Sequence, residues 1–135
     1  MRIVLDASVA LAAVLPDERS PYARAAMEVA ITGELVVPAL WAYEIQNGLL
    51  MAVRRDRIDP PIVRDALAAL AAVAADVRVS RRLGRDLELA QAYGLTVYDA
   101  SYIGVALDSG TQLASFDKTL LRAARAAKVP IFASP

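Results

Sequence analysis

The stretch RIVLDAS, residues 2–8, decides the fold. Residues 2–5 form a short aliphatic, β-branched run, which is typical of a buried strand. A helical pattern over residues 9–15 follows Asp6 and stops at Pro16. The same alternation continues along the chain, with strands predicted at 35–37, 76–79, 111–115 and 130–132 and a short extended piece at 95–97 leading to Asp99. Ser20-Pro21, an N-cap followed by proline, is a typical helix start. Helices are predicted at 21–32, 39–55, 62–75, 83–93, from Asp99 to 108, and 117–127.

Alternating strands and helices predict an α/β fold with right-handed crossovers. We expect three α/β/α layers around a central, mainly parallel sheet of four to five strands. The 135 residues fit one domain, 1–135, because a chain of this length can bury a core of its own.

The composition limits the chemistry. The chain has no Cys and no His. Disulfides, thiolate nucleophiles and cysteine-based zinc sites are therefore excluded, as are the Ser-His-Asp and Cys-His relays. Catalysis must then rely on carboxylates, hydroxyls, Lys or Arg, or on a metal ion.

Charge and hydropathy give weaker indications. Fifteen basic and fifteen acidic residues leave a net charge of zero, but the basic residues cluster at 54–57, 78–85 and 118–128. These clusters suit a polyanion, or they are solvated helix faces. The longest apolar run, 66–75, is too short for a membrane span, and no signal peptide is visible, so a cytoplasmic protein is expected. The apolar content of 57% hints at a dimer or a partner groove.

Four carboxylates are the candidate catalytic residues: Asp6, Glu44, Asp99 and Asp117. Three of them are predicted where a strand gives way to a helix, and the carboxyl ends of parallel strands are where ligands bind in such folds. Glu44 lies on the apolar flank of a helix and needs a partner, because burying an isolated carboxylate is costly. Taken singly, each of the three aspartates is equally well explained as a helix N-cap.

Taken together, the four carboxylates predict a divalent metal site. Close like charges raise one another's pKa unless a cation lies between them. Mg²⁺, or alternatively Mn²⁺, prefers carboxylate oxygens and retains water molecules. Water activated by such an ion can attack a phosphodiester, so hydrolysis without His is the reaction we expect.

Polar neighbours of the carboxylates are candidate supporting residues. Ser8 and Ser115 each lie two residues from an aspartate, and Asn47 lies one helical turn after Glu44. The alternative is that both serines make local turn or helix-start hydrogen bonds and that Asn47 is an ordinary surface residue. Tyr98 and Tyr102 either stack a base or pack in the core or at its rim.

Four short motifs resemble those of a known family. Val4-Leu5-Asp6-Ala7-Ser8 resembles the opening of PIN domains, and Pro38 with Glu44, Asn47 and Leu49 resembles their second motif. The third and fourth resemblances are carried by Tyr98-Asp99-Ala100-Ser101-Tyr102 and Leu113-Ala114-Ser115-Phe116-Asp117. Their order, spacing and the total length agree, and within PIN domains the chain is most similar to VapC-type toxins of toxin–antitoxin pairs.

That resemblance implies a function. It implies a Mg²⁺- or Mn²⁺-dependent endoribonuclease, a hydrolase that is usually a homodimer and sometimes part of a larger toxin–antitoxin assembly. It also implies a small VapB-type antitoxin that wraps the toxin and often places a basic side chain in the acidic pocket. The family's acid positions correspond to Asp6, Glu44, Asp99 and Asp117, and its fourth-motif hydroxyl to Ser115. Some relatives carry a further acid where this chain has Lys118, so the number of ions stays open, as does the identity of the RNA.

Two other functions fit the sequence less well. A different metal-dependent phosphate-transfer enzyme on a similar fold is disfavoured, because a dehalogenase-type phosphatase needs Asp-x-Asp where this chain has Asp6-Ala7-Ser8, and a receiver domain needs an acidic pair there. A non-catalytic PIN-like binding module, with the acids as caps and surface groups, leaves the apolar setting of Glu44 without a reason.

Overall fold

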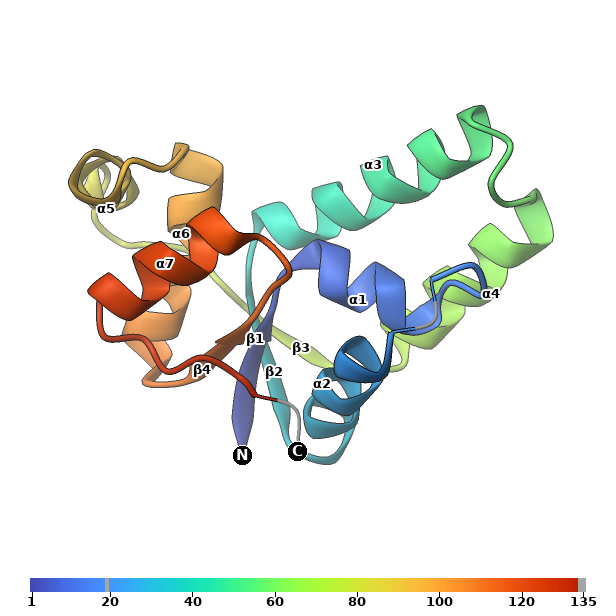
Figure 1. Ribbon diagram of the computed structural model, residues 1–135, viewed down its shortest axis with the longest axis horizontal. Helices are drawn as coiled ribbons and strands as arrows, with labels where there is room; N and C mark the ends of the chain where they lie inside the picture. Colours follow the sequence, from blue (N-terminus) through green and yellow to red (C-terminus); the bar gives the residue numbers. More distant parts are fainter. Residues whose placement is uncertain (19, 134–135) are drawn as a thin grey trace.

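The sheet lies at the centre of the computed structural model, which describes residues 1–18 and 20–133 (Figure 1). Its strands are β1 (Arg2–Leu5), β2 (Glu34–Pro38), β3 (Ala75–Arg78) and β4 (Gln112–Ala114). They are all parallel and lie in the order β3-β2-β1-β4. The predicted parallel sheet is confirmed, and β1, which leads to Asp6, is one of its two central strands.

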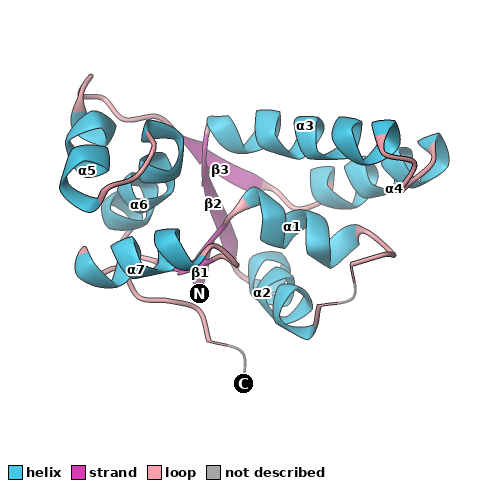
Figure 2. Ribbon diagram, turned by 45° about the horizontal axis from the view of Figure 1, so that its top comes forward, coloured by secondary structure: helices cyan, strands magenta, loops and turns pink. Residues whose placement is uncertain are grey.

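Seven helices are seen in the described part of the chain: α1 (Ala7–Val14), α2 (Pro21–Thr32), α3 (Leu40–Arg54), α4 (Pro60–Ala71), α5 (Arg85–Tyr93), α6 (Val97–Ser109) and α7 (Lys118–Ala126). Figure 2 shows α1–α4 on one side of the sheet and α5–α7 on the other, so the predicted three layers are confirmed. Helix α2 packs on β1 and β2, whereas α6 contacts β1, β2 and β4. None of these helices is long and apolar enough to cross a membrane.

The core forms where the aliphatic strands meet the alanine-rich helices. Ile3, Val4 and Leu5 are fully buried, as is Val36 of β2. Helices α1 and α3 approach closely at Gly48, where a Cβ would lie 2.5 Å from Cδ1 of Leu11. These contacts fix α3, and with it Glu44, beside the beginning of α1.

The last predicted strand, 130–132, is reduced to a single bridge. Ile131 pairs with Leu113 in parallel, and Leu113 donates its N–H to the carbonyl of Pro130 and accepts one from Phe132. Pro130 has no N–H to donate, which limits the length of this pairing. The sheet therefore has four strands, the lower end of the expected range.

The expectation for residues 95–97 was wrong. These residues do not form an extended piece leading to Asp99; instead, α6 begins at Val97 with Thr96 as its N-cap. The Thr96 hydroxyl accepts the Asp99 N–H at 3.1 Å, and this cap outweighs the local β-preference of the sequence. Asp99 consequently lies within the first turn of a helix, and only Asp6 and Asp117 follow strands.

Candidate active site

Asp6 lies at the carboxyl end of β1 and is the N-cap of α1. Its Oδ1 accepts the backbone N–H of Ser8 at 3.2 Å, and its Oδ2 accepts the hydroxyl of Ser115 at 2.8 Å. Both oxygens are therefore held by neutral donors. Ser8 contributes through its backbone, as the local helix-start alternative expected, and its side chain is exposed.

Ser115 joins the ends of two neighbouring strands. Its side chain is buried, and while it donates to Asp6 its Oγ accepts the N–H of Asp117 at 3.0 Å. Asp117 in turn is the N-cap of α7, with Oδ1 accepting the N–H groups of Thr119 and Leu120 at 2.9 and 3.2 Å. One hydroxyl thus ties the Asp6 carboxylate to the backbone of Asp117, while the Asp117 carboxylate is partly engaged as a cap.

Glu44 projects from α3 and finds its partner on α6. The Tyr102 hydroxyl donates a hydrogen bond of 2.6 Å to Oε1 of Glu44. Tyr102 is only 1% exposed, so its ring packs in the core while its hydroxyl reaches the site. The partner required by the apolar setting of Glu44 is therefore a neutral hydroxyl from a residue 58 positions away.

Burial and neighbouring acids shift the titration of two carboxylates. The pKa of Glu44 is raised, mainly by burial and further by the charges of Asp6 and Asp99, although the Tyr102 hydrogen bond opposes the shift. The pKa of Asp99 is also raised, first by burial and then by the charges of Asp117 and Asp6, with a hydrogen bond to Thr96 opposing. The charges of Asp6 and Asp99 thus act on Glu44, and those of Asp6 and Asp117 act on Asp99.

No basic side chain among residues 1–18 and 20–133 forms an ion pair with any of these four carboxylates. The ion pairs in this part of the chain involve other acids. The oxygens of the four acids are the hard donors that Mg²⁺ and Mn²⁺ prefer, so the donor chemistry fits such an ion. As they stand, however, no three acids of the described residues form a group that could hold a metal ion.

The remaining predicted residues are peripheral. Asn47 is exposed, and its side chain makes no hydrogen bond within the described ranges. Tyr98 is 66% exposed on the first turn of α6. The role of Tyr102 was not recognised in the sequence, where its place one turn after Asp99 was the only available signal.

An adjoining groove opens beside the acids. It has a volume of about 340 Å³ and lies between α1 and α3, with Ser8, Leu11, Gly48, Met51 and Phe116 among its lining. Two arginines that follow α3, Arg55 and Arg57, also line it. The groove also includes Glu18, which pairs with Arg57 at 2.8 Å, so it is apolar along its length and carries mixed charge at its outer end.

Comparison with known proteins identifies the family. A profile of the PIN domain matches residues 3–126. Ribonuclease VapC3 of Pyrobaculum aerophilum is 33% identical over 138 aligned residues, which span all of both chains. A crystal structure of PAE2754 from Pyrobaculum aerophilum superimposes with a TM-score of 0.72 at 29% identity, covering 97% of this chain and 88% of the other. The profile match, the full-length similarity and the shared fold agree, and the chain belongs to the PIN domain family.

Proposed function

We propose that this chain is a metal-dependent endoribonuclease that acts as the toxin of a toxin–antitoxin pair. The observation that carries the proposal is the set of acids Asp6, Glu44 and Asp99, which raise carboxyl pKa values in the site and have no basic partner among the described residues. The full-length likeness to a protein named Ribonuclease VapC3 supports RNA as the substrate.

The carboxylates of Asp6, Glu44 and Asp99 would hold the ion, with Asp117 as a further ligand. A bound Mg²⁺ or Mn²⁺ would supply charge for the phosphate and activate water for attack on phosphorus. No three acids of the described residues form a group that could hold a metal ion. Water would therefore complete the coordination of the ion, as is usual for Mg²⁺. Whether a second ion binds depends on Asp117, since one of its oxygens caps α7.

The chain's own residues position this set. Ser115 fixes one oxygen of Asp6, and the backbone of Ser8 fixes the other. Tyr102 fixes Glu44 without neutralising it. Such neutral donors keep each carboxylate oriented and leave its charge available to a cation.

We further propose a VapB-type antitoxin as partner, a homodimer as the assembly of the toxin, and one domain over residues 1–135 in the cytoplasm. The groove beside the acids supports the first of these, because an apolar peptide segment could lie along Leu11 and Met51 while reaching the acidic site near Ser8. Copurification with the product of a neighbouring short gene, followed by light scattering of each state, tests the partner and the dimer.

A non-catalytic binding module is the alternative. Two of the acids, Asp6 and Asp117, are indeed helix caps. Capping gives no reason for the half-buried Glu44 or for Asp99, whose helix is capped by Thr96. The hydrolase therefore remains the better explanation of the whole set.

The experiment is an RNA cleavage assay with wild type and Asp99→Asn, with Mg²⁺ and with EDTA. We expect cleavage only by wild type with the metal, and products carrying a 5′-phosphate and a 3′-hydroxyl, because water is the nucleophile. Cyclic phosphate ends, activity in EDTA, or unchanged cleavage by Asp99→Asn would each contradict the mechanism.

A further inference from the structure

A cavity of about 630 Å³ lies apart from the acids, beside the segment that joins β3 to α5. Four arginines line it: Arg78, Arg81, Arg82 and Arg85. We propose that this cavity binds a backbone phosphate of the RNA strand away from the bond that is cut. The proposal rests on the proposed function in so far as RNA is the substrate.

Arg85 forms the fixed part of the cavity. Its guanidinium side chain is only 17% exposed and pairs with Asp86 at 2.8 Å and with Asp108 at 2.7 Å. It lies against Gly104 of α6, where a Cβ would come within 2.5 Å of its Nη2. Arg85 thus anchors the beginning of α5 to α6, the helix that carries Asp99.

Arg81 and Arg82 are the residues able to take up an anion. Arg82 forms two hydrogen bonds with Glu88, of 2.8 and 2.7 Å, but both side chains are about 60% exposed, so this pair contributes little to stability. Arg81 is exposed and has no ion pair with any residue of 1–18 or 20–133. A phosphate can therefore replace Glu88 as the partner of Arg82 and also bind Arg81, with little loss of stability.

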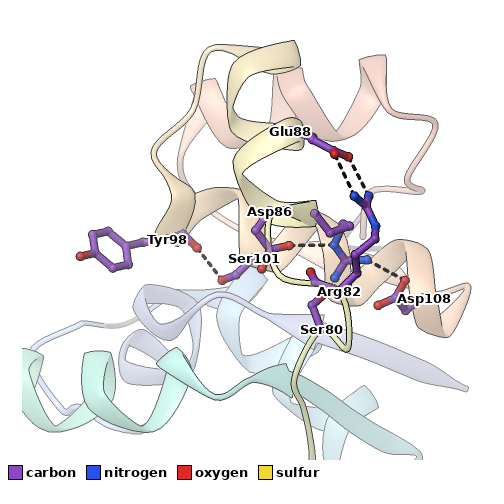
Figure 3. Close-up of polar contacts among 8 residues, drawn as sticks. Ser80, Arg82, Asp86, Glu88, Tyr98, Ser101 and Asp108 are labelled. Carbon is purple, nitrogen blue, oxygen red and sulfur yellow. Dashed lines mark hydrogen bonds and ion pairs between the residues drawn. The ribbon is translucent and has the colours of Figure 1, made fainter.

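Figure 3 shows how the residues around this cavity are arranged. The Arg82 side chain extends toward Glu88 of α5, and Ser80 lies below it, where its hydroxyl donates to the Arg82 carbonyl at 3.1 Å. Ser101 lies between Tyr98 and Asp86 in this view, and its hydroxyl donates a hydrogen bond to the Tyr98 carbonyl. Tyr98 is exposed on the first turn of α6, and its side chain points away from the arginines in this view.

A smaller hollow beside the cavity reaches the carboxyl end of β2. This hollow of about 140 Å³ shares Arg78, Ser80 and Arg85 with the cavity and extends to Pro38 and Ser101. Pro38 ends β2 just before the helix of Glu44, and Ser101 lies two residues after Asp99. A strand whose scissile phosphate lies at the acids would therefore have its neighbouring backbone near the arginines.

The chemistry favours a phosphate over other anions. The guanidinium fork matches phosphate oxygens in a two-pronged contact, and single-stranded nucleic acids follow basic grooves that carry exposed aromatic side chains. In the free protein Arg78 faces Asp76, Arg82 faces Glu88, and Arg85 faces Asp86 and Asp108. Attraction therefore depends on Arg81 and on the replacement of Glu88 at Arg82, which makes these two positions and Glu88 the ones to test.

The test is a fluorescence anisotropy titration of a labelled single-stranded RNA in EDTA, which stops metal-dependent cleavage. The variants are the double substitution Arg81→Gln/Arg82→Gln, Glu88→Gln, and the control Arg2→Gln, which removes an exposed arginine paired with Glu34 at the opposite end of the sheet. Thermal unfolding of each variant checks that it is folded.

We expect the double variant to reduce the magnitude of the slope of log K against log salt by about 0.7, because Arg81 and Arg82 serve one phosphate and each phosphate contact with a single strand contributes about 0.7. Raising salt from about 50 to about 200 mM should then weaken wild type about 2.6-fold more than the double variant. Glu88→Gln should bind more tightly than wild type, and Arg2→Gln should match wild type. An unchanged slope in the double variant, or a wild type that binds no RNA, would overturn the phosphate site. Equal RNA affinity of Glu88→Gln and wild type would contradict the replacement of Glu88 by phosphate at Arg82.

Two further measurements separate this proposal from the others. If poly-glutamate displaces the RNA as well as unlabelled RNA of equal charge does, the cavity binds acidic peptides and the proposal fails. If the salt slope changes as expected while wild type cleaves no RNA with Mg²⁺, the phosphate site stands and the proposed nuclease function falls. If the double variant cleaves RNA with an unaltered kcat/KM and shows an unaltered salt slope, the nuclease function stands and the phosphate site is overturned.

Discussion

Tyr102 and Glu44 are joined by a hydrogen bond of 2.6 Å that links α6 to α3 across the candidate site. The donor is a hydroxyl on a fully buried ring, and the acceptor is a half-buried carboxylate. The pKa of Tyr102 is raised by its burial and by the bond to Glu44, so its proton stays on the hydroxyl and is donated to the carboxylate. This contact orients Glu44 without adding positive charge, which leaves its negative charge available to a cation.

Tyr102→Phe removes this donor while keeping the ring that packs in the core. We expect the free energy of unfolding to fall by about 1.5 kcal/mol, the lower end for hydrogen bonds to charged groups, because Glu44 retains access to water. We also expect weaker Mn²⁺ binding and a lower kcat, because Glu44 loses its fixed orientation. Urea denaturation and Mn²⁺ titration measure the two effects.

Tyr98→Phe is the matched control for that change, since Tyr98 lies on the same helix but is mostly exposed. It should leave both stability and Mn²⁺ affinity at the wild-type level. Equal Mn²⁺ affinity of Tyr102→Phe and wild type would show that the hydroxyl has no positioning role.

Ser115→Ala breaks two contacts, because the hydroxyl donates to Asp6 and also accepts the N–H of Asp117. We expect a loss of about 2 kcal/mol in unfolding free energy, about 1 kcal/mol for each hydrogen bond, and a marked loss of RNA cleavage. The control is Ser109→Ala, whose hydroxyl donates only to the carbonyl of Val105. That variant should cleave RNA normally; if both serine variants cleave equally well, the link between Asp6 and Ser115 is unimportant for activity.

The stability of the cation-free protein should depend on pH with a defined sign. The pKa values of Glu44 and Asp99 are raised in the folded state, by burial and by neighbouring acids. Their contribution is therefore fully present below the ordinary carboxyl pKa and is lost as the pH rises through the folded values. We expect the Tm in EDTA to fall as the pH rises from this range, and Mg²⁺ to restore it at neutral pH but not at acidic pH.

Thermal unfolding across pH, with and without Mg²⁺, measures this effect. Asp99→Asn should flatten the pH dependence, raise the Tm in EDTA and weaken the response to Mg²⁺. Asp65→Asn changes an exposed acid of α4 and should leave all three unaltered. A Tm that is insensitive to Mg²⁺ at neutral pH would contradict the idea that the acids need a cation.

The sequence predicted those features that depend on local chemistry. The aliphatic run before Asp6, the cap and proline at Ser20-Pro21 and the alternation of strands and helices were sufficient for the sheet and its layers. The prediction of an extended piece at residues 95–97 failed because the Thr96 side chain caps a helix there, which the β-branched pattern of these residues does not suggest.

The contacts within the site were beyond the reach of sequence reasoning. The hydrogen bond from Tyr102 to Glu44 joins residues 58 positions apart, and that from Ser115 to Asp6 joins residues 109 apart. Local patterns carry no information on such pairs, because they arise only when the fold brings two elements together. The sequence therefore indicated candidate residues for the site, whereas the fold determined which side chains hold them.

Asp117 offers a way to separate helix capping from cation binding. Asp117→Asn keeps a side-chain oxygen that can accept the N–H groups of Thr119 and Leu120, whereas Asp117→Ala removes it. We therefore expect Asp117→Ala to cost about 1 kcal/mol in unfolding free energy and Asp117→Asn to cost little, because Asn and Asp are similarly good caps. Cleavage and Mg²⁺ affinity should fall in both variants if the Asp117 charge serves the cation, and in neither variant if Asp117 is only a cap. Asp59 provides the control, since it caps α4 through Ile62 outside the acid cluster, so Asp59→Ala should lose similar stability and keep wild-type cleavage.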